Sequence, residues 1–196
     1  SGVQIKIIRE VNGVIPNLSD VSECPPHTVG EIIVTGPSVT HSYDHLPLAT
    51  ARAKIRDGEK IWHRMGDLGS IDAKGRLWFH GRCVEKVETG HGILTTESIE
   101  PAFRNHEDVQ RCALIGIGNA PKQIPVLVIE PKAESFPSNE GERETFVKNL
   151  RIHARHNPLT HQIQRIVFQE SLPVDVRHNA KIHRLHLTDK WNRKLT

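Results

Sequence analysis

An acidic and a basic residue, Asp67 and Arg82, each follow a glycine at the ends of a predicted β-hairpin. Strand-like runs at 68–71 and 76–80 flank residues 72–75, whose Asp and Gly favour a tight turn. Asp67 precedes the first run and Arg82 follows the second, so the hairpin brings them to the same end. A carboxylate and a guanidinium there could contact a ribose diol and a phosphate. The alternative is that both are ordinary turn and surface residues.

Histidine and cysteine patterns do not indicate a second chemistry. Two histidine pairs have i, i+3 spacing, and they are His153 with His156 and His183 with His186. No His-Glu-x-x-His or Cys-x-x-Cys motif accompanies them, so we expect no protein metal site. The sequence also holds three cysteines, which are Cys24, Cys83 and Cys112. Because they are odd in number and far apart, they favour free thiols in a reducing, cytoplasmic setting.

Composition limits the class of protein. The 196 residues are 37% hydrophobic and 25% charged, which suits a globular chain with one large domain or two small ones. The net charge of +3 is too small to indicate nucleic-acid binding, and the basic segment 177–196 has only Trp191 as an aromatic. No apolar run is long enough for an integral membrane segment. The start at Ser1, without an initiator Met or a signal pattern, predicts a piece of a longer protein.

The chain has two halves with different patterns, and these must position the candidate residues. Roughly the first 80 residues are dominated by strands, as expected for a compact β subdomain. The predicted elements are a strand over 4–8, an Asn-Gly hairpin within 11–15, a buried strand over 30–35 stopped by Gly36-Pro37, and a helix over 47–55 closed by Asp57-Gly58.

From Val84 onward, strand and helix patterns alternate, which predicts a small α/β domain. The expected fold class is therefore α+β, with a β subdomain followed by an α/β domain. The predicted elements are a helix from Thr95 or Thr96 to about His106, central strands over 109–117 and 126–129, an amphipathic helix over 142–156 and a strand over 165–169.

Five short motifs follow one another along the chain. They are Gly30-Glu31-Ile32-x-Val34-x-Gly36-Pro37, His63-Arg64-Met65-Gly66-Asp67-Leu68-Gly69, Gly75-Arg76-Leu77-x-Phe79-x-Gly81-Arg82, Thr96-x-x-Ile99-Glu100 and Pro173-Val174-Asp175-x-Arg177-His178-Asn179-Ala180-Lys181-Ile182-x-Arg184. In this order they resemble the later core motifs of acyl-adenylate-forming enzymes, a family that includes acyl-CoA ligases, peptide-synthetase adenylation domains and luciferases. The likeness covers nearly the whole chain.

The resemblance implies a domain boundary. Residues 1–82 correspond to the distal β subdomain of the family's large N-terminal domain, and residues 83–196 to its mobile C-terminal α/β lid domain. The family's Ser/Thr/Gly-rich phosphate loop and its aromatic-Gly-x-Thr-Glu motif do not occur in this sequence. We therefore expect an AMP-forming ligase or synthetase only as a longer chain, and no activity from these 196 residues alone.

The resemblance also implies roles for single residues. Asp67 matches the aspartate that accepts hydrogen bonds from the ribose hydroxyls of ATP, and Arg82 matches an arginine that contacts ribose or phosphate. The hinge between the domains falls at Cys83 and Val84. Lys181 matches the catalytic lysine, whose ammonium stabilises negative charge on oxygen at the reacting centre. Mg2+ would arrive with ATP rather than in a protein cage.

Two runs are most similar to the β-lactone synthetases of bacterial olefin biosynthesis, namely Gly81-Arg82-x-x-x-Lys86-Val87-Glu88-Thr89 and the Arg-His-Asn-Ala-Lys-Ile run that ends at Ile182. Those enzymes adenylate the carboxylate of a long-chain 2-alkyl-3-hydroxy fatty acid, whose own hydroxyl then closes the lactone. The implied partners are ATP and a long-chain acyl carboxylate, with other olefin-pathway enzymes as candidates. The alternatives are a fatty-acyl-CoA or acyl-AMP ligase, or an inactive binding module that retained the fold.

The sequence departs from the family pattern at four places. Val84 stands where an Asp or Lys is usual, and Gly90-His91-Gly92 replaces a single glycine in the loop that admits pantetheine in CoA ligases. Ser98 stands where the family often has Glu, and Asn179-Ala180 replaces the usual glycine before the lysine. Because lactone closure needs no thiol acceptor, the second departure fits a β-lactone synthetase.

Overall fold

The computed structural model describes residues 2–175 and 181–195. The chain divides into two compact units, Ser1–Val84 and Glu85–Thr196. The first is built around an antiparallel sheet and the second is α/β, which confirms the predicted fold class. The boundary between the units lies two residues beyond the predicted one between residues 82 and 83, and the correspondence of the units to two enzyme domains stays a prediction.

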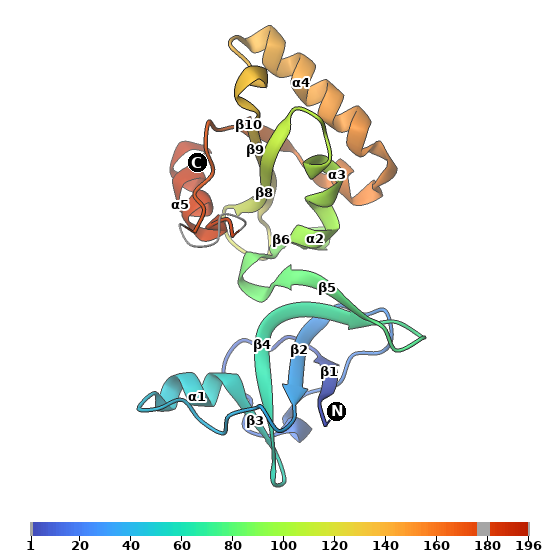
Figure 1. The fold of residues 1–196 in the computed structure, drawn as a ribbon, viewed down its shortest axis with the longest axis vertical. Coiled ribbons are helices and arrows are strands. Elements are labelled where there is room, and N and C mark those ends of the chain that lie inside the picture. The colour runs from blue at the N-terminus through green and yellow to red at the C-terminus, as the bar shows by residue number, and fades with distance from the viewer. Residues whose placement is uncertain (1, 176–180, 196) are drawn as a thin grey trace. The chain divides into compact units, whose positions relative to one another are not determined.

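The first unit is organised by one long strand, β4 (Lys60–Ile71). It pairs antiparallel with three others, β2 (Gly30–Thr35), β3 (Lys54–Asp57) and β5 (Leu77–Arg82), and β1 (Gln4–Ile8) completes the sheet beyond β2 (Figure 1). Two short helices, a 3-10 turn at Leu18–Asp20 and α1 (Pro47–Ala53), lie in the connections. The core of the unit consists of Ile8, Ile15, Ile33, Ile55 and Trp62.

One prediction in this unit is wrong and another is confirmed only in part. The segment 11–15 does not form a hairpin, because β1 pairs instead with β2, where Ile7 lies opposite Ile32 and both are buried. The predicted helix over 47–55 ends at Ala53. Residues 54–57 form β3 instead, because Ile55 is fully buried in the core when it lies opposite Trp62 on β4.

The second unit contains a three-stranded sheet in the order β10-β9-β8. β9 (Ile124–Pro131) is central, β8 (Val109–Ile117) runs antiparallel to it, and β10 (Arg165–Phe168) runs parallel to it. The predicted strand over 109–117 is therefore present, but it lies at an edge of this sheet. The remaining elements are β6 (Val87–Thr89), β7 (Gly92–Leu94), α2 (Thr96–Ile99), α3 (Pro101–Arg104), α4 (Glu140–His153), α5 (Arg184–Leu195) and 3-10 turns at Cys83–Glu85, Ala133–Ser135, Ala154–His156 and Pro158–Gln162.

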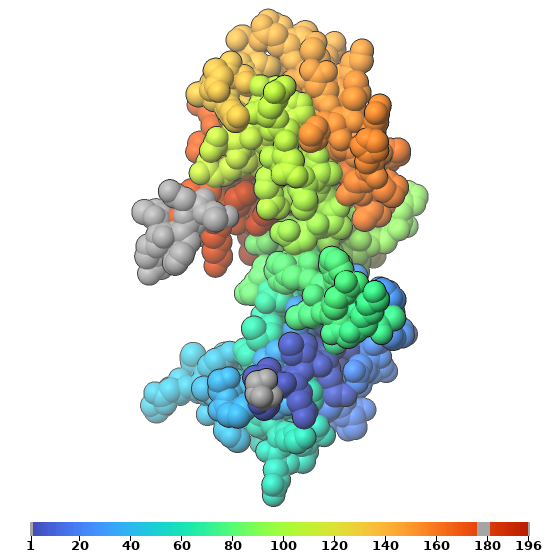
Figure 2. All heavy atoms as spheres, turned by 45° about the vertical axis from the view of Figure 1, so that its right-hand side comes forward, coloured from blue at the N-terminus to red at the C-terminus, as the bar shows by residue number. Residues whose placement is uncertain are grey.

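Alternation along β8 explains how this sheet is covered. Cys112 and Leu114 point into a core shared with α2, α3 and α4, whereas Ala113 and Ile115 point into a second core shared with α5. Successive strand residues face opposite sides, so one strand serves both cores. The helices accordingly lie on the two sides of the sheet (Figure 1), and α4, in orange, forms part of the outer surface (Figure 2).

Candidate functional site

The predicted hairpin is confirmed, and it brings Asp67 and Arg82 together. The two residues are direct partners in the β4–β5 register, and Arg82 Nη1 donates a hydrogen bond of 2.7 Å to Asp67 Oδ1. Gly66 and Gly81 precede them with φ angles of +65° and +110°. Glycine adopts such angles without the steric cost that a Cβ would add. The two glycines therefore allow the strand ends to turn as the pair requires.

The Asp67–Arg82 pair is accessible. The side chain of Arg82 is 54% exposed and that of Asp67 is 17% exposed. Within the described residues, Asp67 Oδ2 has no hydrogen-bond partner. Because exposed ion pairs contribute little to stability, a ligand with hydroxyl or phosphate groups can replace or share this one at small cost.

A buried ion pair anchors β4 just before Gly66. Arg64 donates to Glu31 Oε2 through Nε at 2.9 Å and through Nη2 at 2.6 Å. It also donates to the carbonyl oxygens of Val11 at 2.8 Å and Gly13 at 2.6 Å. These contacts tie the loop after β1 and strand β2 to β4, which fixes the strand three residues ahead of Asp67.

A second carboxylate, Asp72, fixes the turn of the hairpin. Its oxygens accept hydrogen bonds from the backbone N–H groups of Lys74 and Arg76, from Arg76 Nε and from Trp78 Nε1, at 2.6–3.1 Å. These donors, led by the Arg76 backbone N–H, outweigh the effect of burial and lower the pKa of Asp72 to about 2. Asp72 is therefore a structural carboxylate that holds the far end of the hairpin.

The predicted hinge residues lie in the 3-10 turn Cys83–Glu85, directly after β5. Val84 is 68% exposed, and Cys83 is a partly buried cysteine that is not in a disulfide. The last residue of the first unit is Val84. A swivel at this point remains a prediction.

Lys181 belongs to the second unit, and its side chain is exposed. Its carbonyl oxygen accepts a 2.9 Å hydrogen bond from the Asp175 N–H, and the next residue, Ile182, forms an antiparallel bridge with Val174. The residues before it that belong to the same motif, 177–180, lie outside the described part of the chain. Lys181 thus combines a fixed backbone with a side chain that is open to a ligand.

Glu100 and Arg184 each lie within one of the five motifs, and the sequence alone predicts no role for either. They form a buried ion pair across 84 residues, with Arg184 Nη2 at 2.7 Å from Glu100 Oε2. The sequence marks them only by position, as a carboxylate next to Ile99 in a predicted helix and an arginine three residues after Lys181, and no local pattern pairs them.

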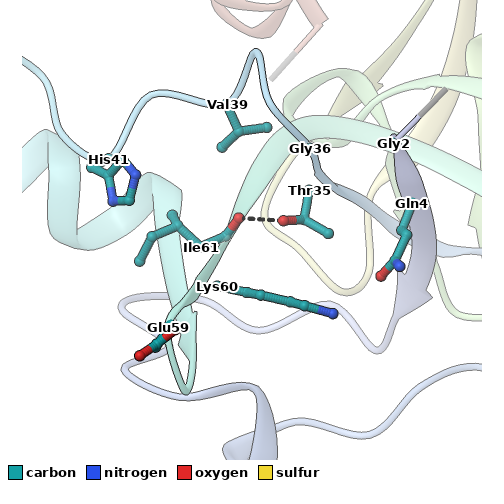
Figure 3. A pocket seen from close by; sticks show the side chains of 9 residues that line it. All are labelled: Gly2, Gln4, Thr35, Gly36, Val39, His41, Glu59, Lys60 and Ile61. Atoms are coloured by element: carbon teal, nitrogen blue, oxygen red, sulfur yellow. Dashed lines mark hydrogen bonds between the residues drawn. The ribbon is translucent and has the colours of Figure 1, made fainter.

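Two hollows in the first unit contain none of the predicted site residues among their lining side chains. One of about 260 Å³ is shown in Figure 3, where Thr35 Oγ1 donates to the Ile61 carbonyl at 2.8 Å. It is lined by Gly2, Gln4, Thr35, Gly36, Val39, His41, Glu59, Lys60 and Ile61. A wider one of about 1030 Å³ lies beside α1 and includes Lys54, where burial lowers the pKa of the ammonium group.

The described residues contain neither a candidate metal cluster nor a candidate membrane-spanning helix. Among the residues that the structure describes, no group of three His, Cys, Asp or Glu side chains could hold a metal ion. No helix in the described ranges combines the length and apolar character that crossing a membrane requires.

No family model matches the chain. The chain is similar to the olefin beta-lactone synthetase of Xanthomonas campestris pv. campestris, with 42% identity over 186 residues. This match covers 92% of this chain and 33% of that protein.

Two solved structures have a fold similar to that of this chain. Bacillus subtilis O-succinylbenzoate coenzyme A synthetase (MenE), in complex with AMP, matches with a TM-score of 0.72 at 25% identity, over 96% of this chain and 34% of that one. ATP-bound MatB from Rhodopseudomonas palustris matches with a TM-score of 0.74 at 20% identity, over 100% and 35% of the two chains. The chain spans about a third of the length of each of these proteins.

Proposed function

Because the chain belongs to the acyl-adenylate-forming enzymes, we propose that it is the C-terminal third of an ATP-dependent enzyme that makes a β-lactone. The substrate of this enzyme is a long-chain 2-alkyl-3-hydroxy fatty acid. The observation that carries the proposal is the 42% identity, over 92% of the chain, to a protein named olefin beta-lactone synthetase. A further enzyme of olefin formation would consume the lactone, and the three cysteines, none of which is in a disulfide, agree with a cytoplasmic reaction.

The first step is adenylation. A carboxylate oxygen of the fatty acid attacks the α-phosphorus of ATP, and pyrophosphate leaves. Asp67 accepts hydrogen bonds from the ribose hydroxyls, for which its Oδ2, without a hydrogen-bond partner among the described residues, is suited, and Arg82 contacts ribose or phosphate. Mg2+ arrives with the phosphates of ATP, as is usual for this ion.

Lys181 acts at the reacting centre. Its ammonium stabilises the negative charge that builds on the oxygens around the α-phosphorus, and it does so without giving up its proton. The exposed side chain on a fixed backbone has the reach for this role. A swivel at Cys83 and Val84 brings the second unit to the nucleotide.

Ring closure is the second step. The 3-hydroxyl oxygen of the bound acyl group attacks the acyl carbon, the bond from that carbon to the AMP oxygen breaks, and the hydroxyl proton is released. The β6–β7 hairpin supports this outcome because its turn, Gly90-His91, is closed by hydrogen bonds from Thr89 Oγ1 to the Gly92 carbonyl and from the His91 N–H to Thr89 Oγ1. It offers a compact turn at the position where CoA ligases admit a thiol.

An acyl-CoA ligase is the second candidate, favoured by the match to a coenzyme A synthetase at a TM-score of 0.72. The deciding experiment incubates the intact enzyme with ATP, Mg2+ and a 2-alkyl-3-hydroxy fatty acid, with and without CoA. We expect AMP, pyrophosphate and a β-lactone in amounts independent of CoA. A CoA-dependent thioester would establish the ligase instead, and no pyrophosphate under any condition would favour an inactive binding module.

A further inference from the structure

The Arg184 side chain, at the start of α5, is held by hydrogen bonds to the carboxylate of Glu100. Its Nε donates to Glu100 Oε1 at 2.9 Å and its Nη2 to Glu100 Oε2 at 2.7 Å, which is the two-point geometry of a strong pair. The Leu114 N–H on β8 also donates to Glu100 Oε1, at 2.9 Å. The Glu100 side chain is 2% exposed. Glu100 therefore fixes the guanidinium to the edge of the sheet.

The same guanidinium reaches a second carboxylate. Arg184 Nη1 donates to Glu85 Oε2 at 3.2 Å, and both side chains are 15% exposed. Burial works to lower the pKa of Arg184, but hydrogen bonding to Glu100 and the charges of Glu100 and Glu85 raise it above its ordinary value. Glu85 is the last residue of the 3-10 turn that contains Cys83 and Val84. Arg184 thus connects the residue after the predicted hinge to the start of α5.

The segment before Arg184 carries Lys181. Ile182 is buried in the core with Leu172 and Leu187, and the His183 N–H donates to the Pro173 carbonyl at 2.8 Å. The backbone of Lys181 is therefore held by the residues that follow it, first through the bridge at Ile182 and then, three residues after Lys181, through Arg184.

We infer that Arg184 is a positioning residue for Lys181, acting through Glu100 and Glu85. This inference rests on the proposed role of Lys181 in adenylation. A lysine on a long stem reaches a reacting phosphate productively only if its backbone is placed accurately, since a shift of about 1 Å can cost on the order of a hundredfold in rate. Because Arg184 also contacts Glu85, the residue after the hinge, a rotation at the hinge would move the Lys181 backbone together with Glu85.

A double-mutant cycle in the intact enzyme tests this inference. Arg184→Lys keeps the positive charge but cannot make the two-point contact and the third bond together. We expect the kcat of carboxylate-dependent pyrophosphate release to fall by about tenfold to a hundredfold, because Lys181 is displaced. The KM for ATP should stay unchanged, since Asp67 and Arg82 are intact. In the Lys181→Ala background the same substitution should change kcat by no more than about twofold.

A matched control separates positioning from a general loss of packing. Arg111 also pairs with a buried carboxylate of this sheet, with Nη1 at 2.6 Å from Glu130 Oε1. We expect Arg111→Lys to leave kcat within about twofold of the wild type in both backgrounds. If Arg184→Lys does not fold, Glu85→Gln, which removes the charge at the 3.2 Å contact, takes its place in the same cycle.

Four results would each contradict a stated part of this argument. An equal loss of kcat from Arg184→Lys with and without Lys181 would overturn the inference, as would full activity of Arg184→Lys alone. Absence of pyrophosphate release from the wild-type enzyme would instead refute the proposed function. Full activity of Lys181→Ala would refute the role of Lys181 on which the inference depends.

Discussion

Two arginine–carboxylate pairs of this chain have the same closest N–O distance of 2.7 Å but opposite surroundings. Arg82 meets Asp67 through one nitrogen at the end of a hairpin, where the guanidinium side chain is 54% exposed. Arg184 meets Glu100 through two nitrogens and Glu85 through the third, and its side chain is 15% exposed.

The difference shows why distance alone does not identify a binding site. The exposed pair loses little when a ligand replaces one of its members, because water already screens it. The buried pair cannot exchange partners without leaving a charge uncompensated, which is strongly destabilising. We therefore propose ligand contact for the Asp67–Arg82 pair and a structural, positioning role for the Arg184 cluster.

The largest effect is expected from Lys181→Ala in the intact enzyme. Loss of the ammonium should lower the rate of adenylation by about a hundredfold to a thousandfold, as for other single groups that stabilise transition-state charge. The unfolding transition should not move, because the Lys181 side chain is exposed. Rapid-quench measurement of acyl-AMP, together with thermal unfolding, checks both parts. Adenylation at the wild-type rate would remove Lys181 from the mechanism.

The same chemical change in the two pairs should separate them in stability. Glu100→Gln leaves the buried Arg184 charge without its main partner and should lower the free energy of unfolding by about 3–5 kcal/mol. Asp67→Asn should lower it by no more than about 1 kcal/mol. Urea unfolding of the chain followed by circular dichroism measures both values. Equal losses would show that burial does not distinguish the pairs as we describe.

For nucleotide affinity we expect the reverse order, with the larger effect from the exposed Asp67–Arg82 pair. Asp67→Ala in the intact enzyme should weaken ATP binding by about tenfold to a hundredfold, the usual worth of hydrogen bonds to a charged group. Glu31→Gln, which alters a buried pair of the same unit, is the control for indirect effects on the hairpin. Isothermal titration with ATP gives both constants. Unchanged affinity in the Asp67 variant would end its assignment to the ribose.

The smallest effect concerns pH and Asp72, the second carboxylate of the hairpin. The pKa of Asp72 is lowered to about 2, so its ionised form is favoured in the folded chain. Its contribution to stability is complete above its ordinary pKa near 4 and is lost as the pH falls toward about 2. We expect Asp72→Asn to flatten the pH dependence of the unfolding midpoint between pH 4 and pH 2. Parallel curves for wild type and variant would contradict the lowered pKa.

Sequence patterns predicted those parts of the fold that are determined by residues close together in the chain. The turn residues 72–75 and the strand alternation around them were sufficient to place Asp67 opposite Arg82, because a hairpin is closed by its own sequence. The Asn-Gly pair within 11–15 was misleading, since β1 gains more by pairing with β2 and burying Ile7. The local pattern also placed Ile55 in a helix, because it does not show that Ile55 becomes buried beside Trp62 when it forms a strand.

The Arg184 cluster could not be predicted from the sequence. Its members are separated by 84 and 99 positions, and pairing across such distances depends on the tertiary fold. The roles predicted for individual residues such as Lys181 depend on the resemblance of their motifs to those of a known family. Arg184 and Glu100 stood in the same motifs, but only their distances and burial indicate what they do.

The most direct test of the account is ATP–pyrophosphate exchange driven by a long-chain 2-alkyl-3-hydroxy fatty acid. It is measured for the intact enzyme and, in parallel, for the 196-residue chain alone. The account predicts exchange by the intact enzyme that depends on the fatty acid, and none by the isolated chain, whose sequence lacks the phosphate loop. Exchange catalysed by the isolated chain, or none by the intact enzyme, would contradict it.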